Sequence, residues 1–124
     1  MGNNSFPKNE RILKRGDFLK LSRRGKKVQT SFFLALFIDG ALGHNRIGIT
    51  VSRKVGNAVV RNRIKRHVRE YYRTKKDSIS GTRDINIIAR KYASTLSSSQ
   101  FPCELDRLFR KIEQIDPAPI LPQL

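Results

Sequence analysis

The sequence predicts an α+β fold in which one small β-sheet is sandwiched with helices, in the order α-β-β-α-β-α. Three observations support this fold class. The 124 residues are enough for one domain with a modest core. Residues 28–38, 46–52 and 84–90 are rich in the β-branched and aromatic side chains that favour strands. Residues 58–75, between the second and third of these stretches, contain no Gly or Pro and have helical periodicity.

The two ends of the chain lack such periodicity. Residues 1–10 are polar and contain Pro7, so we expect them to be disordered. Residues 116–124 are Pro-rich and cannot continue a helix, which predicts an extended tail. The remaining residues, 11–115, are predicted to form a single domain without an internal repeat or an interdomain linker.

A short helix is predicted at residues 17–24. Asp17 is suited to its N-cap and Gly25 to its end. Phe18 and Leu21 give this helix one apolar side. The Lys and Arg side chains around it form the second basic cluster of the chain.

The first two predicted strands differ in pattern. Residues 28–38 are apolar on both faces from Phe32 onward, so both faces need a neighbour. In residues 46–52, Ile47, Ile49 and Val51 point inward, and only small residues point the other way. We therefore expect an open groove on that second face. The small residues are Gly48, Thr50 and Ser52.

The third strand, residues 84–90, precedes a last helix. Ser97 to Ser99 are expected to cap that helix, and Pro102 is tolerable in its first turn. Its apolar residues recur at helical spacing and predict an ordinary core face. They are Phe101, Leu105, Leu108, Phe109 and Ile112.

The helix at residues 58–75 is the most informative element. Asn57 is a plausible N-cap, and a narrow apolar stripe is formed by Val60, Ile64, Val68 and Tyr71. Residues 52–76 contain ten Lys or Arg and one acid, Glu70. Like charges stand four residues apart at Arg61, Lys65 and Arg69, a spacing that destabilises an isolated helix. A polyanionic partner is the natural counter-charge.

The composition limits the classes of partner. A formal net charge of +16 points to nucleic acid or an anionic membrane. The longest apolar run, residues 32–38, is far too short to span a bilayer, so we expect no membrane partner. Cys103 is the single cysteine, which excludes an intrachain disulfide and predicts no disulfide-linked partner. No apolar signal-peptide core follows Met1, and the protein is expected to be cytoplasmic.

The acidic and histidine side chains form no catalytic or metal-binding pattern. The ten acids are scattered, and we expect Asp106 to pair with Arg107 and Arg110 at the surface. His44 lies in a turn, and His67 lies at the edge of an apolar face, where packing is the usual role. We therefore expect neither catalytic nor metal-ligating residues in the chain. We expect the chain to assist another catalyst and not to cleave a substrate alone.

The residues also carry a resemblance to a known family. Gly56-Asn57-Ala58 followed by Arg61-Asn62-Arg63 and residues 64–66 resembles the signature of the bacterial ribonuclease P protein subunit. Residues 46–54, 87–90 and 105–111, and the pair Asp17-Phe18, match the surrounding elements. The similarity covers residues 11–113. It implies the same element order, in some members with an extra short strand, and a left-handed βαβ crossover.

The resemblance also implies a function. In that ribonucleoprotein the RNA, with bound Mg ions, removes the 5′ leader of precursor tRNA, and the protein is the non-catalytic subunit. The protein alone is expected to bind no cofactor. Residues matching positions that contact the catalytic RNA are Arg53, Lys54, Asn57, Arg61, Asn62, Arg63, Lys65, Arg66 and Arg69. Residues matching the leader-binding cleft are Phe18, Leu34, Leu36 and Thr50. The chain departs from the family at Ser22, where many members have an aromatic or bulky residue, and at Leu36, where an aromatic residue is frequent.

Two alternatives remain open. One is a general, ribosomal-type RNA-binding protein without a catalytic partnership. The Arg-Asn-Arg run together with a cleft that contains an aromatic residue argues against it. The other is a DNA-binding regulator that places the basic helix in a major groove. No helix-turn-helix pair is predicted, because strands flank the basic helix.

Overall fold

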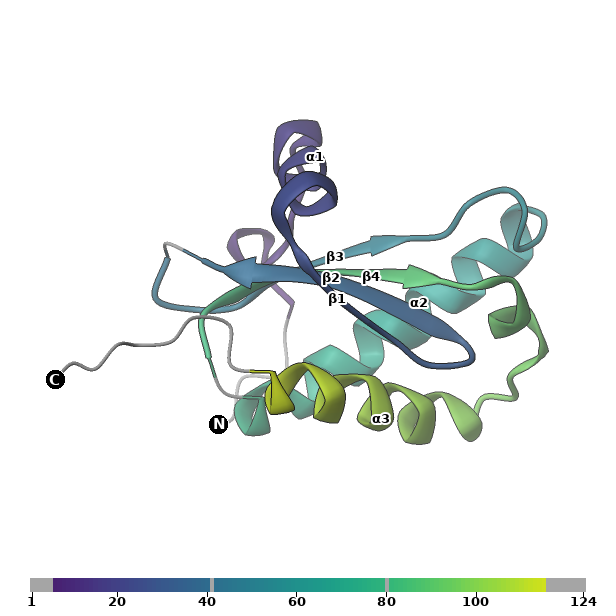
Figure 1. Cartoon of the computed structure of the whole chain (residues 1–124). Coiled ribbons are helices and arrows are strands. Elements are labelled where there is room, and N and C mark those ends of the chain that lie inside the picture. Colours follow the sequence, from purple (N-terminus) through teal and green to yellow (C-terminus); the bar gives the residue numbers. More distant parts are fainter. Residues whose placement is uncertain (1–5, 41, 80, 116–124) are drawn as a thin grey trace, which may run out of the picture.

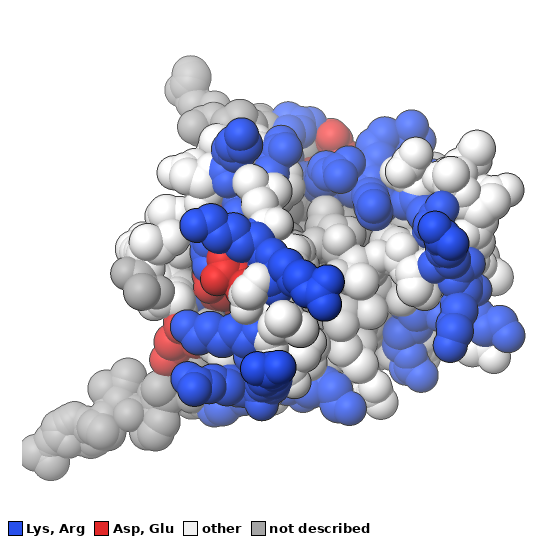
Figure 2. Space-filling model, turned by 90° about the horizontal axis from the view of Figure 1, so that it is seen from above, with Lys and Arg blue, Asp and Glu red and all other residues white. Residues whose placement is uncertain are grey.

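The computed structural model describes residues 6–40, 42–79 and 81–115. In these residues the chain forms one four-stranded sheet of order β1-β2-β4-β3 and three α-helices, which confirms the predicted α+β class. Helix α1 lies on one face of the sheet, and α2 and α3 lie on the other (Figure 1). Figure 2 looks onto the α1 side. The elements are α1 Arg15–Arg24, β1 Lys26–Gln29, β2 Phe33–Asp39, β3 Arg46–Thr50, α2 Ala58–Lys75, β4 Arg83–Ala89 and α3 Gln100–Gln114, with 3-10 turns η1 Lys8–Glu10, η2 Lys76–Ser78 and η3 Lys91–Thr95.

The predicted single strand at residues 28–38 is wrong, because β1 and β2 form an antiparallel hairpin there. The Thr30 hydroxyl closes the turn by accepting from the amides of Phe32 and Phe33, at 3.3 and 3.2 Å. A threonine turn of this kind has no Gly or Pro to mark it in the sequence. The hairpin supplies the extra short strand that the family resemblance allowed.

Strands β3 and β4 pair in parallel, with Ile47 opposite Ile85 and Ile49 opposite Ile87. Parallel neighbours need a long crossover connection, and α2 provides it. Strand β3 ends at Thr50, two residues before the predicted end. The turn that follows leads directly into α2, so the position of the basic helix is set by the strand before it.

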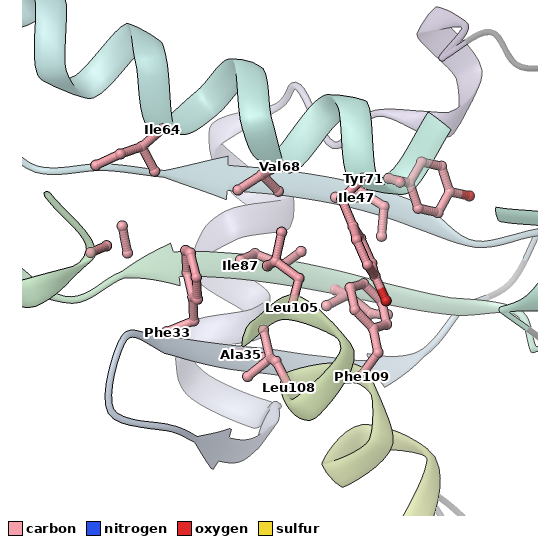
Figure 3. Close-up of a cluster of buried hydrophobic side chains, with 14 of the residues drawn as sticks. Phe33, Ala35, Ile47, Ile64, Val68, Tyr71, Ile87, Leu105, Leu108 and Phe109 are labelled. Atoms are coloured by element: carbon pink, nitrogen blue, oxygen red, sulfur yellow. The ribbon is translucent and has the colours of Figure 1, made fainter. Parts of the chain in front are cut away.

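The core lies between the sheet and the helix pair α2 and α3 (Figure 3). The predicted apolar stripe of α3 is buried along its whole length, and the stripe of α2 is buried at Ile64, Val68 and Tyr71. Burying one such side chain contributes about 1.5–3 kcal/mol. The strand side chains that meet them include Phe33, Ala35, Ile47 and Ile87.

Two helix ends differ from the expectations. Helix α1 begins at Arg15, before Asp17, with Lys14 at its N-cap. Its end does require Gly25, because a Cβ there would lie 2.5 Å from the carbonyl oxygen of Leu21. The N-cap position of α3 is occupied by a serine whose side chain makes no capping hydrogen bond. The Gln100 side chain accepts instead from the amide of Ser97, at 2.8 Å.

The N-terminal segment corrects the prediction of disorder at residues 6–10. Phe6 is buried, with its ring 5.3 Å from that of Tyr72. Glu10 forms a salt bridge with Lys76 at 3.0 Å. The amide of Ile12 then donates to the carbonyl of Ile47 in β3, at 3.0 Å. Residues 1–5 and the predicted tail at residues 116–124 lie outside the described residues.

Candidate nucleic-acid interface

Helix α2 carries the main cationic surface. The Asn57 side chain caps the helix by accepting from the amide of Val60, at 3.0 Å. Beyond the cap, Lys65, Arg66 and Arg69 point away from the core, and among the described residues no acid pairs with them. Such unneutralised charge favours a phosphate backbone as partner. Predicted residues that are exposed or half-exposed on this surface also include Arg61 and Asn62.

The one acid of α2 does not offset this charge. Glu70 is bonded to Arg73, one turn further along the helix. This hydrogen bond holds the pKa of Glu70 below its usual range. The pair lies toward the C-terminal end of the helix, away from the cap. The first three turns of α2 are therefore cationic on their exposed side.

The turn between β3 and α2 extends the same surface. Val55 is buried, and its amide donates to the carbonyl of Ser52 at 3.1 Å, which fixes the turn. Arg53 and Lys54 are exposed within it. They lie just before the N-terminus of α2, where the free amides and the helix dipole also favour anions. Asn57 is part of this end of the helix, both as cap and as a predicted contact.

Arg63 is placed differently from the other predicted contacts. Its guanidinium donates to the carbonyl of Leu96 at 2.8 Å and lies 5.5 Å from the ring centroid of Phe101. The His67 ring also stacks on Phe101, with 4.3 Å between the two ring centroids. Burial, followed by the charges of Arg63 and its neighbour Arg66, lowers the pKa of His67. Arg63 and His67 therefore help to join α2 to α3.

The second predicted site lies on the opposite face of the sheet. Phe18, Leu34, Leu36 and Thr50 are all half-buried on the α1 side. Leu34 and Thr50 are in one row across the sheet, joined through Ile88 of β4. In Figure 2 this side shows Lys and Arg around a pale central area with few acids. The structure thus brings the four residues to one face.

The expected open groove at Gly48 is partly filled. The Phe18 ring lies directly over this glycine, and a Cβ at position 48 would be 2.6 Å from its Cε1 atom. The small residue is therefore needed for a close approach of α1. The exposed part of the face lies further along, where Thr50 donates to the buried side chain of Asn86 at 3.0 Å.

An ion-pair cluster holds α1 on the sheet. The Arg46 guanidinium donates to both carboxylate oxygens of Asp84, at 2.9 and 2.6 Å, and to Asp17 at 3.3 Å. The hydrogen bond to Asp84 is the main reason why the pKa of Arg46 is raised. Asp17 thus serves as an anchor of α1 and not as its N-cap. This cluster fixes the helix that carries Phe18.

Several of the acids and both histidines make structural contacts. Asp106 accepts from the Tyr71 hydroxyl at 2.6 Å, which corrects the expected pairing with Arg107 and Arg110. His44 lies 2.9 Å from the carbonyl of Asn9. Among the described residues, no three His, Cys, Asp or Glu side chains could hold one metal ion. Cys103 is exposed.

The sequence reasoning missed the contribution of the N-terminal segment. Arg11 and Leu13 line a hollow of about 180 Å³ together with Phe18, Lys65 and Arg69. The hollow connects residues from both predicted sites. The signal in the sequence was slight, a lone Phe6 in a polar segment. None of the helices in residues 6–40, 42–79 and 81–115 has the length and apolarity needed to cross a bilayer.

Comparison with known proteins assigns the family. A family model described as Ribonuclease P matches residues 6–113. The ribonuclease P protein component of Desulforapulum autotrophicum is 58% identical over 94% of this chain and 99% of its own length. The Thermotoga maritima component is 43% identical over 73% of this chain and 77% of its own length. The structure of the Staphylococcus aureus RNase P protein matches with a TM-score of 0.80 and 34% identity, covering 84% of this chain and 95% of that one. The chain therefore belongs to the ribonuclease P protein family.

Proposed function

We propose that this chain is the non-catalytic protein subunit of a cytoplasmic ribonuclease P. It binds the catalytic RNA and the 5′ leader of precursor tRNA and assists the Mg-dependent endonucleolytic removal of that leader. The observation that carries this proposal is the cationic surface of α2, where Lys65, Arg66 and Arg69 have no acidic partner among the described residues. Family membership supports the RNA partner.

The catalytic RNA is assigned to the α2 side. An array of cations on the exposed side of one helix can neutralise several phosphates without reading base sequence. Arg63 is half-buried beside this array, and its guanidinium donates to the carbonyl of Leu96. The proposed contacts are Arg53, Lys54, Asn57, Arg61, Asn62, Arg63, Lys65, Arg66 and Arg69.

The leader is assigned to the α1 side. A single strand can stack its bases on aromatic rings, and stacking tolerates any sequence. Phe18 offers such a ring, held in place by its contact with Gly48. Leu34, Leu36 and Thr50 provide a half-exposed surface beside it. Helices α1 and α2 lie on opposite faces of the sheet, and the two proposed sites meet at the hollow where Phe18 lies near Lys65 and Arg69.

The side chains of the described residues do not fit a role as magnesium ligands. Mg²⁺ prefers oxygen ligands and usually needs one or two carboxylates. No three His, Cys, Asp or Glu side chains of the described residues could hold one metal ion, and the two acids that converge, Asp17 and Asp84, are both paired with Arg46. We propose that the Mg ions are bound within the RNA and that the protein takes part in no step of bond cleavage.

Reconstitution tests the proposal. The purified protein is added to a ribonuclease P RNA at a low Mg²⁺ concentration that leaves the RNA alone inactive, and precursor-tRNA cleavage is measured. We expect the protein to restore cleavage. A triple variant Arg61→Gln, Arg66→Gln, Arg69→Gln should fail at the same concentration, whereas Arg107→Gln, Arg110→Gln on α3 should succeed. A protein that binds RNA but never restores cleavage is a general RNA-binding module, and the proposal is then wrong.

The absence of a catalytic role is tested in single-turnover cleavage by the assembled enzyme. Glu104→Gln, Asp106→Asn and His67→Gln should each leave the rate of the chemical step nearly unchanged, because Asp106 and His67 make packing contacts. Loss of a catalytic group costs on the order of a thousandfold. A loss of that size in any of the three variants, in a protein that still assembles, would contradict the assignment.

A further inference from the structure

A groove lies between α3 and the turn that joins β1 to β2, and we call it the β1–α3 groove. Its volume is about 430 Å³. Strand β1 is an edge strand of the sheet, and α3 lies below it in Figure 1. No residue that we propose to contact RNA lines this groove. Its lining residues include Thr30, Phe32, Glu104, Arg107, Arg110 and Lys111.

The outer edge of β1, which borders the groove, keeps backbone groups free for a further strand. In an antiparallel pair, successive residues direct these groups alternately toward the partner strand and away from it. The Thr30 amide donates to the carbonyl of Phe33 in β2, at 2.8 Å. Gln29 and Lys27 therefore direct their backbone groups outward. The Nζ atom of Lys111 donates to the outward carbonyl of Gln29, at 2.9 Å. The two outward amides and the Lys27 carbonyl are left for a ligand.

The α3 side of the groove is cationic. The charges of α3 balance overall, but all three of its Lys or Arg line the groove and only one of its three acids, Glu104, does so. Asp106 bonds to Tyr71 instead. Arg107 and Arg110 are exposed and pair with no acid among the described residues. This excess of positive charge favours a ligand that carries carboxylates.

The turn gives the groove a fixed wall. The Arg90 guanidinium donates to the carbonyl of Thr30 at 2.6 Å, and the Thr30 hydroxyl accepts from the amide of Phe32 at 3.3 Å. Phe32 packs against the core and is half-buried, so part of its ring remains as an apolar surface beside the cations. A preformed wall lowers the cost of ordering when a ligand binds.

We infer that the β1–α3 groove binds an extended acidic peptide segment of a partner protein, which adds to β1 as an outer strand. Its backbone would bond to Lys27 and Gln29, and its carboxylates would face Arg107 and Arg110. A second copy of this chain fits poorly, because two paired β1 edges would bring Lys26 and Lys27 of both copies together. A single RNA strand could use the cations, but its backbone has no N–H and C=O groups at strand spacing. The inference goes beyond the proposed function and does not depend on it.

The test measures binding of a short, fluorescent, terminally blocked peptide, in which Glu alternates with Val, to the full-length protein. The same peptide with all backbone amides N-methylated carries equal charge and should bind at least about tenfold more weakly, because its backbone hydrogen bonds are lost. Hydrogen exchange gives a direct readout of strand addition. On peptide binding it should slow at the amides of Lys27 and Gln29 and stay nearly unchanged at Val28, which is opposite Ala35 in β2 and already bonded to it.

Matched variants separate the groove from the rest of the basic surface. Arg107→Gln with Arg110→Gln should weaken peptide binding about two- to thirtyfold, the scale of two exposed ion pairs. Arg61→Gln with Arg66→Gln makes the same change in net charge on α2 and should leave it nearly unchanged. Lys27→Pro removes one outward N–H at an edge position that tolerates proline, and should weaken binding about two- to tenfold more than Lys27→Gln. Thermal unfolding checks that each variant is folded.

Four results would overturn the inference. They are no binding at millimolar peptide, equal affinity for the N-methylated peptide, displacement of the peptide by single-stranded RNA whose own binding needs Arg107 and Arg110, and a dimer in sedimentation that Lys27→Pro abolishes. The last two would assign the groove to RNA or to a second copy of the chain. Precursor-tRNA cleavage by the assembled enzyme does not use the groove, so each of these results would leave the α2 assignment standing.

Discussion

Helices α2 and α3 pack side by side against the same face of the sheet, yet their exposed sides differ. Helix α2 carries seven Lys or Arg and one acid, whereas α3 carries three Lys or Arg and three acids. Both bury an apolar stripe. Mixed charge on α3 is what a solvated face normally shows, since opposite charges one turn apart stabilise a helix.

The difference separates stability from function. Packing against the sheet needs only one stripe of each helix, so it cannot explain why α2 accepts repulsion among its cations. The cost of that repulsion is a few tenths of a kcal/mol per pair, small beside what the buried stripe contributes. The exposed side of a helix can therefore bind a charged partner while its buried stripe keeps the helix packed against the sheet.

The largest expected effect is the loss of RNA affinity as the salt concentration rises. Roughly six to eight phosphate contacts on the α2 side predict a log–log slope on the order of −4 to −7 for binding to the catalytic RNA. Affinity should then fall about 10²- to 10⁴-fold between 50 and 200 mM monovalent salt. Arg61→Gln with Arg66→Gln should make the slope shallower by about 1.5, and Arg107→Gln with Arg110→Gln should leave it unchanged. A flat slope in a filter-binding titration would exclude the electrostatic role of α2.

Truncation of a buried apolar side chain should destabilise the protein to a similar extent in the two helices. Ile64→Ala in α2 and Leu105→Ala in α3 remove fully buried side chains, and each should lower the free energy of unfolding by about 2–5 kcal/mol. Val59→Ala, at a position 77% exposed, should change it by less than about 0.5 kcal/mol. Urea unfolding measures all three. A neutral Ile64→Ala would mean that α2 is not held by its stripe.

A smaller effect is expected where the helices meet. Tyr71 of α2 donates to Asp106 of α3, and burial, reinforced by this hydrogen bond, raises the pKa of Tyr71. Tyr71→Phe removes the donor and should cost about 1–2 kcal/mol in the free energy of unfolding. In a double-mutant cycle, Asp106→Ala should lower the free energy of unfolding only slightly further when it is made in the Tyr71→Phe variant. Fully additive costs would show that the two side chains are not coupled.

The smallest effect is on the pH dependence of stability. Burial lowers the pKa of His67, so the folded state favours its neutral form. Unfolded protein then binds more protons below the ordinary pKa of 6.5, and the stability contribution present above that pH is lost as the pH falls through it. His67→Gln should remove this component from unfolding curves recorded between pH 5 and 8. An unchanged pH profile in the variant would contradict this origin.

Local patterns in the sequence were enough to predict both helices. The stripes of α2 and α3, and the Asn57 cap, follow from spacing within a few turns, and the structure confirms them. The α+β class and the order of the main elements were predicted in the same way. The assignment of individual side chains to each RNA depends on the family resemblance and stays a prediction.

Long-range contacts could not be predicted in this way. Phe6 is ordered because it packs on Tyr72, a residue 66 positions later, and nothing near Phe6 in the sequence indicates this. The β1–β2 turn is closed by the amide and the hydroxyl of Thr30, without a Gly or Pro. Arg63 cannot be distinguished in the sequence from its neighbours in the basic run, yet its guanidinium donates a hydrogen bond to the carbonyl of Leu96. Such contacts depend on tertiary structure.

The glycine under Phe18 sets the position of the aromatic ring in the proposed leader site. Gly48 lies beneath the ring, and even one added methyl group would meet it at 2.6 Å. An alanine there would lift the ring outward and make the hollow shallower, while every side chain proposed to touch RNA stayed the same. Leader preference could therefore drift between species, or be engineered, through a backbone position beneath the site. The affinities of the Gly48→Ala and wild-type enzymes for precursors with different leaders can be compared. The comparison would show how much one methyl group changes leader preference.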